Sequence, residues 1–323
     1  AGLLGGGCSA LALYVGRFDL LLLGAGLTGI FRSTHGYFRF AAADTASEEF
    51  KPKAISLVLA GGLLSAFIGP EIVRSTTDAI DSTPYAGAYL AVIAINVIGS
   101  LGLLFLDIPT PPRKKKGEKS GRDLKEIFTQ PKTVVAVICA MVSYAMMTLV
   151  MTSTTLAMTA TGFTTAGAAD VIRWHIIAMF APSFFTGVII SRIGQLRVIT
   201  IGLTLLGIAA FISVSGDEVE NFYFALIALG LGWNFGFIGA TSLLTTTHTS
   251  EEQAKVQGLN DVLVSGLVTI ASFGSGAILQ IYGWEYVQYA MIPALSLAAL
   301  AILWLAIKTR RARSIEPNFG GMR

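Results

Sequence analysis

One apolar stretch of the chain, residues 19–43, carries an unusual set of charged side chains. Arg32, His35 and Arg39 stand there at positions i, i+3 and i+7, and Thr28 lies one turn earlier. This spacing places all four on one face of a helix. A cation pair on such a face can line a cavity and hold an anionic group of a small molecule, such as a carboxylate or a phosphate. The alternative is an arginine paired with an acid on another helix or with backbone carbonyls.

A second group of polar and aromatic side chains occurs in other apolar stretches. Tryptophan and tyrosine suit stacking on a ring, and a histidine can titrate near neutral pH or serve as a hydrogen-bonded structural residue. Packing between helices is the competing interpretation for each. Asp170 and Arg173 stand three residues apart, so we expect them to pair. The candidates in this group are Asn96, Tyr144, His175, Trp233 and Asn234.

The composition of the chain indicates which class of protein carries these residues. The chain has 323 residues, 53% of them hydrophobic and 13% charged, with a mean hydropathy of +0.67. Soluble domains carry about 25% charged residues. A soluble enzyme, a disordered protein and a disulfide-stapled domain are therefore excluded, the last because only Cys8 and Cys139 are present. Neither a phosphate-binding G-x-x-x-x-G-K-[ST] loop nor an H-E-x-x-H metal motif occurs, so we expect no enzyme, no cofactor and no metal site.

Ten apolar stretches predict an all-α integral membrane protein, because most of them are long enough to cross a bilayer core of about 30 Å. Of the 23 Lys and Arg residues, 18 fall in alternate loops and in the tail 308–323. The positive-inside rule then places both visible ends of the chain on the cytoplasmic side. We expect the protein to lie in the cytoplasmic (inner) membrane. The predicted spans are 2–16, 19–43, 54–73, 85–106, 133–158, 168–190, 197–214, 220–246, 257–281 and 285–307.

An internal repeat divides the chain into two halves. Ser47-Glu48-Glu49 and Ser250-Glu251-Glu252 lie 203 residues apart, each after a glycine-rich span. Halves of like topology are typical of secondary transporters. The first half, 1–106, shows four spans and the second, 133–307, shows six, so we expect two further helices before Ala1 and twelve in all. A basic linker, 107–132, joins the halves.

Four motifs then resemble the major facilitator superfamily (MFS). The resemblance covers the whole chain and implies helices three to twelve of a carrier that works by alternating access, with its site between the halves near the membrane midplane. The motifs are Gly187-x-x-x-Ser191-Arg192-x-Gly194-x-x-Arg197, the two Ser-Glu-Glu segments, Gly69-Pro70, and Leu124-Lys125-Glu126-Ile127 with Pro131.

The first motif predicts a conformational latch at the cytoplasmic side. Gly187 allows two helices to approach closely, and Gly194 permits a tight turn. Arg192 can bond a carboxylate of the second Ser-Glu-Glu segment, and Arg197 can meet a helix end. A short turn with inside positive charge is the alternative. Members of the predicted latch are Gly187, Arg192, Gly194, Arg197, Glu48, Glu49, Glu251, Glu252, Asp261, Gly69 and Pro70.

Two departures from the family pattern affect this prediction. Ser191 replaces the aspartate of the loop, which weakens the latch. Ser65 and Val73-Arg74 replace glycines around Gly69-Pro70, an element that goes with antiporters in the family. The direction of transport therefore stays open between export and uptake.

The expected function is secondary active transport of a small organic solute, anionic or ring-bearing, with the proton as coupling ion and the protein as a monomer in the lipid bilayer. Asp261, His35, His175 or an acid on a further helix can serve the coupling. The alternative is a non-transporting MFS-like sensor or partner-binding protein. The run Arg113–Lys116 is interpreted as a lipid-touching topogenic loop rather than a nucleic-acid site.

Overall fold

A computed structural model describes residues 1–76, 79–80, 83–105 and 121–315, and the regular secondary structure of this part is entirely helical. The all-α prediction is therefore confirmed. The first half contains α1 Gly2–Val15, α2 Phe18–His35, α3 Phe38–Thr45, α4 Lys51–Ala60, α5 Gly62–Thr76 and α6 Ala86–Leu103. The second contains α7 Leu124–Phe128, α8 Pro131–Ala160, α9 Thr165–Phe180, α10 Ser183–Ile193, α11 Gln195–Val214, α12 Val219–Leu244, α13 Gln253–Tyr282, α14 Trp284–Tyr289 and α15 Met291–Ile315.

Several predicted spans agree closely with single helices. The helices α1, α8, α11 and α12 begin and end within two residues of the predicted bounds. Other spans consist of two consecutive helices. The span predicted at 168–190 breaks into α9 and α10 around Ala181-Pro182, because proline has no N–H for a helical hydrogen bond. The span predicted at 19–43 breaks into α2 and α3.

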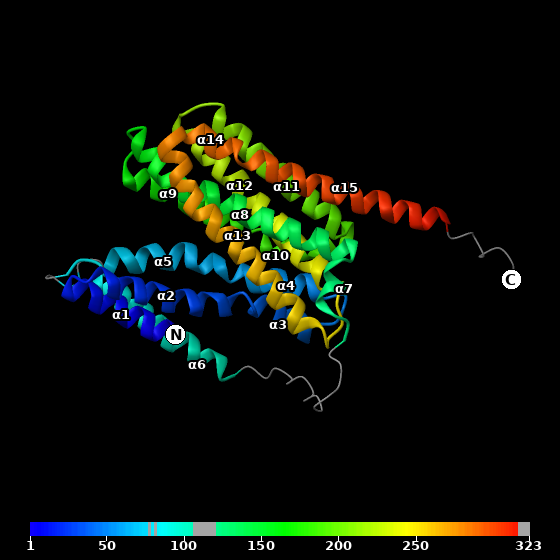
Figure 1. The fold of residues 1–323 in the computed structure, drawn as a ribbon. Coiled ribbons are helices and arrows are strands. Elements are labelled where there is room, and N and C mark those ends of the chain that lie inside the picture. Colours follow the sequence, from blue (N-terminus) through cyan, green and yellow to red (C-terminus); the bar gives the residue numbers. More distant parts are fainter. Residues whose placement is uncertain (77–78, 81–82, 106–120, 316–323) are drawn as a thin grey trace.

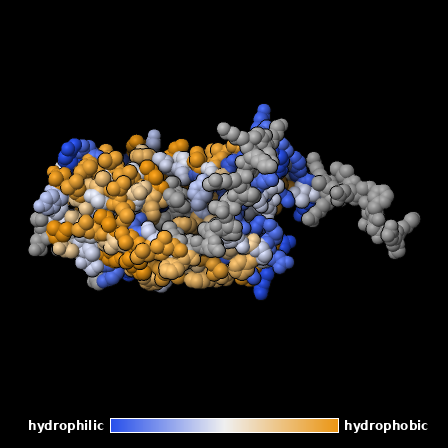
Figure 2. Space-filling view, turned by 90° about the horizontal axis from the view of Figure 1, so that it is seen from below, coloured by the Kyte–Doolittle hydropathy of each residue, from blue (hydrophilic) through white to orange (hydrophobic). Residues whose placement is uncertain are grey.

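The helices form a bundle with one broad apolar surface. In the described part, seven helical stretches are long and apolar enough to cross a membrane, and α1 and α6 are shorter apolar helices. Figure 2 shows hydrophobic residues over the middle of one face and hydrophilic residues gathered toward its ends. Large side chains such as Phe211 and Phe273 are exposed on α11 and α13. Exposed aromatics of this size are suited to lipid contact.

Helices of the second half pack around α8 and α12. Most of α12 is buried, and it lies closest to α11, where glycines face each other: a Cβ built on Gly202 would lie 2.3 Å from the backbone nitrogen of Gly236. Figure 1 shows α1, α2, α5 and α6 on one side and α8, α9, α11 and α15 on the other. The two groups meet where α3, α4, α7 and α10 gather, and we call this the linker end.

Candidate functional site

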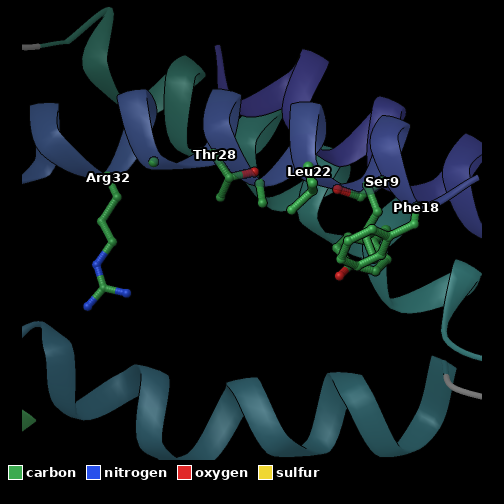
Figure 3. Close-up of a pocket in the computed structure, with 9 residues that line it drawn as sticks. Ser9, Phe18, Leu22, Thr28 and Arg32 are labelled. Atoms are coloured by element: carbon green, nitrogen blue, oxygen red, sulfur yellow. The ribbon is translucent and has the colours of Figure 1, made fainter. Parts of the chain in front are cut away.

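A pocket of about 490 Å³ opens between α1, α2 and α6. Arg32 is exposed, and Figure 3 shows its side chain extending from α2 into open space. It has no hydrogen-bond or ion-pair partner in the described part of the chain. Thr28 lines the same pocket and donates a hydrogen bond to the Gly24 carbonyl of its own helix (2.9 Å). The lining residues are Ser9, Phe18, Leu21, Leu22, Ala25, Thr28, Gly29, Arg32 and Tyr89.

Arg39 does not share this pocket, contrary to the predicted four-residue face. Because α2 ends at His35 and α3 begins at Phe38, the i, i+7 register between Arg32 and Arg39 is interrupted. Arg39 instead forms an ion pair with Asp261 of α13, with Nη2 and Oδ1 2.5 Å apart. The side chains of this pair are only 8% and 18% exposed. The side chain of His35 lies outside the described residues.

Two aromatic rings and one amide surround the Arg39–Asp261 pair. The guanidinium carbon of Arg39 lies 4.5 Å from the ring centroid of Phe40 and 4.7 Å from that of Phe237. Such contacts favour a cation on the ring face. Asn260 donates to the Asp261 carboxylate at 3.1 Å. The pair therefore joins the first half to the second through α3, α12 and α13.

An aromatic cluster occupies the region where the halves meet. Trp233 stacks on Phe237 with centroids 5.3 Å apart, and it meets Tyr144 at 5.5 Å and Phe180 at 5.6 Å in edge-to-face geometry. A Cβ built on Gly62 of α5 would lie 2.6 Å from the Phe180 ring, so the cluster reaches the first half. Trp233 is 2% exposed, and its Nε1 has no hydrogen-bond partner in the described part.

Asn234 is a structural residue in this conformation. It is fully buried, and its Nδ2 donates to the Met179 carbonyl and to Ser183 Oγ, both at 2.6 Å. Its Oδ1 accepts from Thr186 Oγ1 at 2.6 Å. The amide is therefore occupied by protein partners at the break between α9 and α10.

Two further candidates pack between helices. His175 is buried, and its Nδ1 lies 2.7 Å from the Leu226 carbonyl, which agrees with the structural interpretation. Asn96 of α6 donates to the Val92 carbonyl of its own helix at 2.8 Å. A Cβ on Gly2 would lie 2.4 Å from Asn96 Oδ1, so this residue contacts α1. The predicted pair Asp170–Arg173 is present, at 3.0 Å.

The two glycines of the predicted latch lie at a close helix contact and at a turn. A Cβ on Gly187 would lie 2.6 Å from the Lys53 Cα, so α10 and α4 approach closely there. Gly194 has φ +88°, which permits the turn between α10 and α11. Arg192 and Arg197 are exposed and have no ion-pair partner in the described part.

Glu252 bonds Arg122 of the linker instead of Arg192, which corrects the predicted latch. The backbone N–H and Nε of Arg122 both donate to Oε1 at 2.8 Å, and Nη2 donates to Oε2 at 2.6 Å. Thr249 N–H adds a bond to Oε2 at 3.0 Å. The Arg122 hydrogen bonds, with that from Thr249, hold the pKa of Glu252 well below its ordinary value.

The remaining latch candidates lie elsewhere. Glu48 is exposed and pairs with Lys51 of the following turn at 2.6 Å, and Glu49 is exposed beside it. Glu251 is exposed next to Glu252. Gly69 lies within α5, where a Cβ would meet open space, and the side chain of Pro70 lies outside the described residues.

Comparison with known proteins identifies the family. The model of the Major Facilitator Superfamily matches residues 1–172 and residues 136–321. The chain belongs to this superfamily. It is therefore a multi-pass membrane protein of a family of transporters, not of enzymes.

Two curated MFS relatives cover most of the chain. The riboflavin transporter RfnT of Brucella anthropi is 39% identical over 308 residues, which are 94% of this chain and 76% of that protein. The uncharacterized MFS-type transporter YdeG of Bacillus subtilis is 28% identical over 90% of this chain and 72% of its own length.

Solved structures share the MFS fold. The transporter FucP in the outward conformation matches with a TM-score of 0.68 at 12% identity, over 94% of this chain and 80% of that one. A bacterial homologue of the iron transporter ferroportin in an outward-facing state matches with a TM-score of 0.65 at 14% identity, over the same shares of the two chains. These matches establish the fold.

Proposed function

We propose that this MFS protein is a secondary transporter that carries riboflavin, or a closely similar ring-bearing molecule, between its halves 1–106 and 133–307 by alternating access. Riboflavin combines a flat heteroaromatic ring system with a polar chain. The similarity to RfnT supports this substrate. The aromatic cluster is the observation that carries the proposal. Its rings gather where the two halves meet, and Trp233, which is 2% exposed in this conformation, can stack on a substrate ring once the halves separate.

The polar end of the substrate has a separate candidate partner in Arg32. A guanidinium supplies five N–H donors, which suit the oxygens of a carbonyl, a hydroxyl chain or a phosphate. Arg32 is exposed and has no protein partner in the described part, whereas Arg39 is paired with Asp261. We therefore assign substrate contact to Thr28, Arg32, Tyr144 and Trp233. Arg39 is assigned to the gate, by which we mean the Arg39–Asp261 contact between the two halves.

The linker end faces the cytoplasm in this proposal, because Lys and Arg are concentrated in the loops at that side. The contacts between α3 and α13 and between α4 and α10 then close the cytoplasmic side of the protein. Opening of that side requires the Arg39–Asp261 pair to separate. Alternating access thus has a named contact that must form and break in each cycle.

Asp261 is the proposed proton-coupling residue. It lies eight residues into α13, which is about 12 Å along the helix axis from its start. Protonation of its carboxylate removes the charge that holds Arg39, so proton binding favours separation of the halves. Asn260 Oδ1 is buried beside it on the same helix without a hydrogen-bond partner in the described part, which gives the carboxylate polar surroundings.

The decisive experiment measures riboflavin uptake by proteoliposomes that contain the full chain, with and without an inward proton gradient. We expect gradient-dependent accumulation. Trp233→Ala reduces it about tenfold, whereas Trp174→Ala, at an exposed tryptophan of α9, leaves it unchanged. Arg32→Ala raises the half-saturating riboflavin concentration, and an unaltered value would contradict its contact with substrate.

Binding without flux would support the sensor alternative. Riboflavin fluorescence falls when its ring stacks on an indole, so quenching reports binding independently of transport. Quenching that Trp233→Ala abolishes, in vesicles that accumulate no riboflavin, would identify a ligand-binding protein that does not transport. Absence of both quenching and uptake would contradict riboflavin as the ligand.

A further inference from the structure

Ser56 of α4 contacts the backbone of a helix in the other half. Its hydroxyl donates to the Ser183 carbonyl and accepts from the Gly187 N–H at 3.1 Å. Ser183 and Gly187 stand at i and i+4 in α10. An uninterrupted α-helix joins such a carbonyl and N–H to each other. One side chain of the first half therefore lies against both ends of a helical hydrogen bond in the second half.

Two features of α10 make this contact possible. Pro182 precedes the helix and separates it from α9, so the Ser183 turn is at a helix start rather than inside a long helix. Gly187 lacks the Cβ that would lie 2.6 Å from the Lys53 Cα and from the Pro52 carbonyl oxygen. Any larger residue at 187 would push α4 away, and Ser56 would lose both partners.

The same segment is held from the opposite side by α12. Asn234 donates to Ser183 Oγ and accepts from Thr186 Oγ1, both at 2.6 Å. The side chains of Ser56, Ser183, Thr186 and Asn234 are at most 1% exposed. The start of α10 is thus fixed between α4 of the first half and α12 of the second by buried hydrogen bonds.

We propose that Ser56 is a positioning residue that couples the gate to the aromatic cluster, an inference that rests on alternating access as the proposed function. When the halves separate at the linker end, Ser56 withdraws. The Gly187 N–H and the Ser183 carbonyl stay joined by the i, i+4 bond of α10, so neither group is left unsatisfied in the membrane. Both states are satisfied, which is the condition for a reversible contact.

Phe180 connects the start of α10, where Ser56 binds, with the proposed substrate region. This residue ends α9, two positions before Pro182, and its ring lies 5.6 Å from Trp233 and against Gly62 of α5. A change at the start of α10 therefore alters the support of the aromatic cluster. Release of Ser56 and repositioning of Phe180 form one movement, so the closed cytoplasmic side and the ring-binding geometry occur together.

Spin-label distance measurements test this proposal without any substrate. Labels at Glu48→Cys and Arg192→Cys, both exposed at the linker end, report the separation of the halves in a background of Cys8→Ala and Cys139→Ala. We expect Ser56→Ala to shift the population ratio toward the longer distance by roughly fivefold to tenfold, since two hydrogen bonds between the halves are lost. Ser65→Ala is the matched control, because Ser65 is exposed and bonds only the Gly62 carbonyl of its own helix.

A second variant separates positioning from stability. Ser56→Cys keeps a weak donor and acceptor and should give a shift between those of the wild type and Ser56→Ala. Identical distance distributions for Ser56→Ala and Ser65→Ala would overturn the proposal, whatever their melting temperatures. Failure of riboflavin uptake does not affect this readout, so the two proposals fail independently.

Discussion

Two arginine–carboxylate pairs lie toward the linker end, and they differ in what they join. Arg39–Asp261 connects α3 of the first half with α13 of the second. Arg122–Glu252 connects the linker, just before α7, with the residue that precedes the same α13. The first pair makes one direct bond, supported by Asn260 and by aromatic rings. In the second, the carboxylate accepts four hydrogen bonds.

This difference separates a contact that can open from one that anchors. A carboxylate whose lone pairs are all occupied loses several bonds if its partner leaves, and a buried charge left unpaired is costly. A single bond beside rings that can still cover the cation is easier to break. Arg39–Asp261 therefore suits the moving contact between the halves, and Arg122–Glu252 suits a fixed attachment of the linker.

The largest expected effect is a loss of transport when the Arg39–Asp261 pair is broken. Asp261→Asn removes the charge that holds Arg39, so the halves lose their bond and the proposed proton site. We expect uptake in proteoliposomes to fall at least tenfold and to lose its response to a proton gradient. Glu49→Gln, at an exposed acid of the linker end, serves as the control. Gradient-driven uptake that persists in Asp261→Asn would refute both roles of this residue.

Substitution in the second pair, Arg122–Glu252, should lower the stability of the protein and leave transport almost unchanged. Glu252→Gln breaks the anchor and leaves Arg122, whose side chain is 33% exposed, without its carboxylate, at a cost of roughly 2 kcal/mol. We expect a lower melting temperature in detergent, with uptake per folded molecule close to that of the wild type. Glu49→Gln, at an exposed acid of the linker end, should change the melting temperature little. A transport defect in Glu252→Gln at wild-type stability would make this pair part of the gate.

The sequence indicated the fold better than the pairing. Hydropathy predicted the spans because a bilayer core requires long apolar helices. Glycine at 187 and 194 indicated a close helix contact and a turn, and the structure has Lys53 against Gly187 and a φ of +88° at Gly194. The predicted bond between Arg192 and Glu252 was wrong, because Glu252 bonds Arg122. Arg122 lies within the basic linker, and composition cannot show that the chain there contacts the residue before α13.

The candidate site shows the same limit on a smaller scale. Arg32 and Arg39 share a helical face only if the helix continues, and the break after His35 separates them. Asn234 has the side-chain chemistry of a binding residue, yet the Pro182 break offers it partners inside the protein. Side-chain type suggests what a residue can bind, whereas helix breaks decide which partner it meets.

The pH dependence of the anchor follows from Glu252. Its pKa in the folded protein lies below the ordinary 4.5, because the hydrogen bonds stabilise the carboxylate. The contribution of this group to stability is therefore complete above about pH 4.5 and is lost as pH falls through the folded-state pKa. The melting-temperature difference between wild type and Glu252→Gln should be constant at neutral pH and shrink in acid. A difference that grows in acid would contradict this assignment.

The smallest expected effect is on stability in mild acid, and it comes from His248, which lies between α12 and α13 beside the Arg122–Glu252 pair. Burial lowers the pKa of His248 from 6.5, Lys51 and Arg122 lower it further, and the Thr249 carbonyl and Glu252 oppose these effects. The unfolded chain therefore binds a proton more tightly at this position, so stability declines as pH falls below about 6.5. We expect a loss under about 1 kcal/mol, which His248→Gln removes.

Melting temperatures of wild type and His248→Gln between pH 7.5 and pH 3 measure this effect, with Glu252→Gln alongside. The histidine acts near pH 6.5 and the carboxylate acts below pH 4.5, so one titration resolves the two groups of the anchor. An acid-induced loss of stability that is the same in wild type and His248→Gln would assign it to other residues.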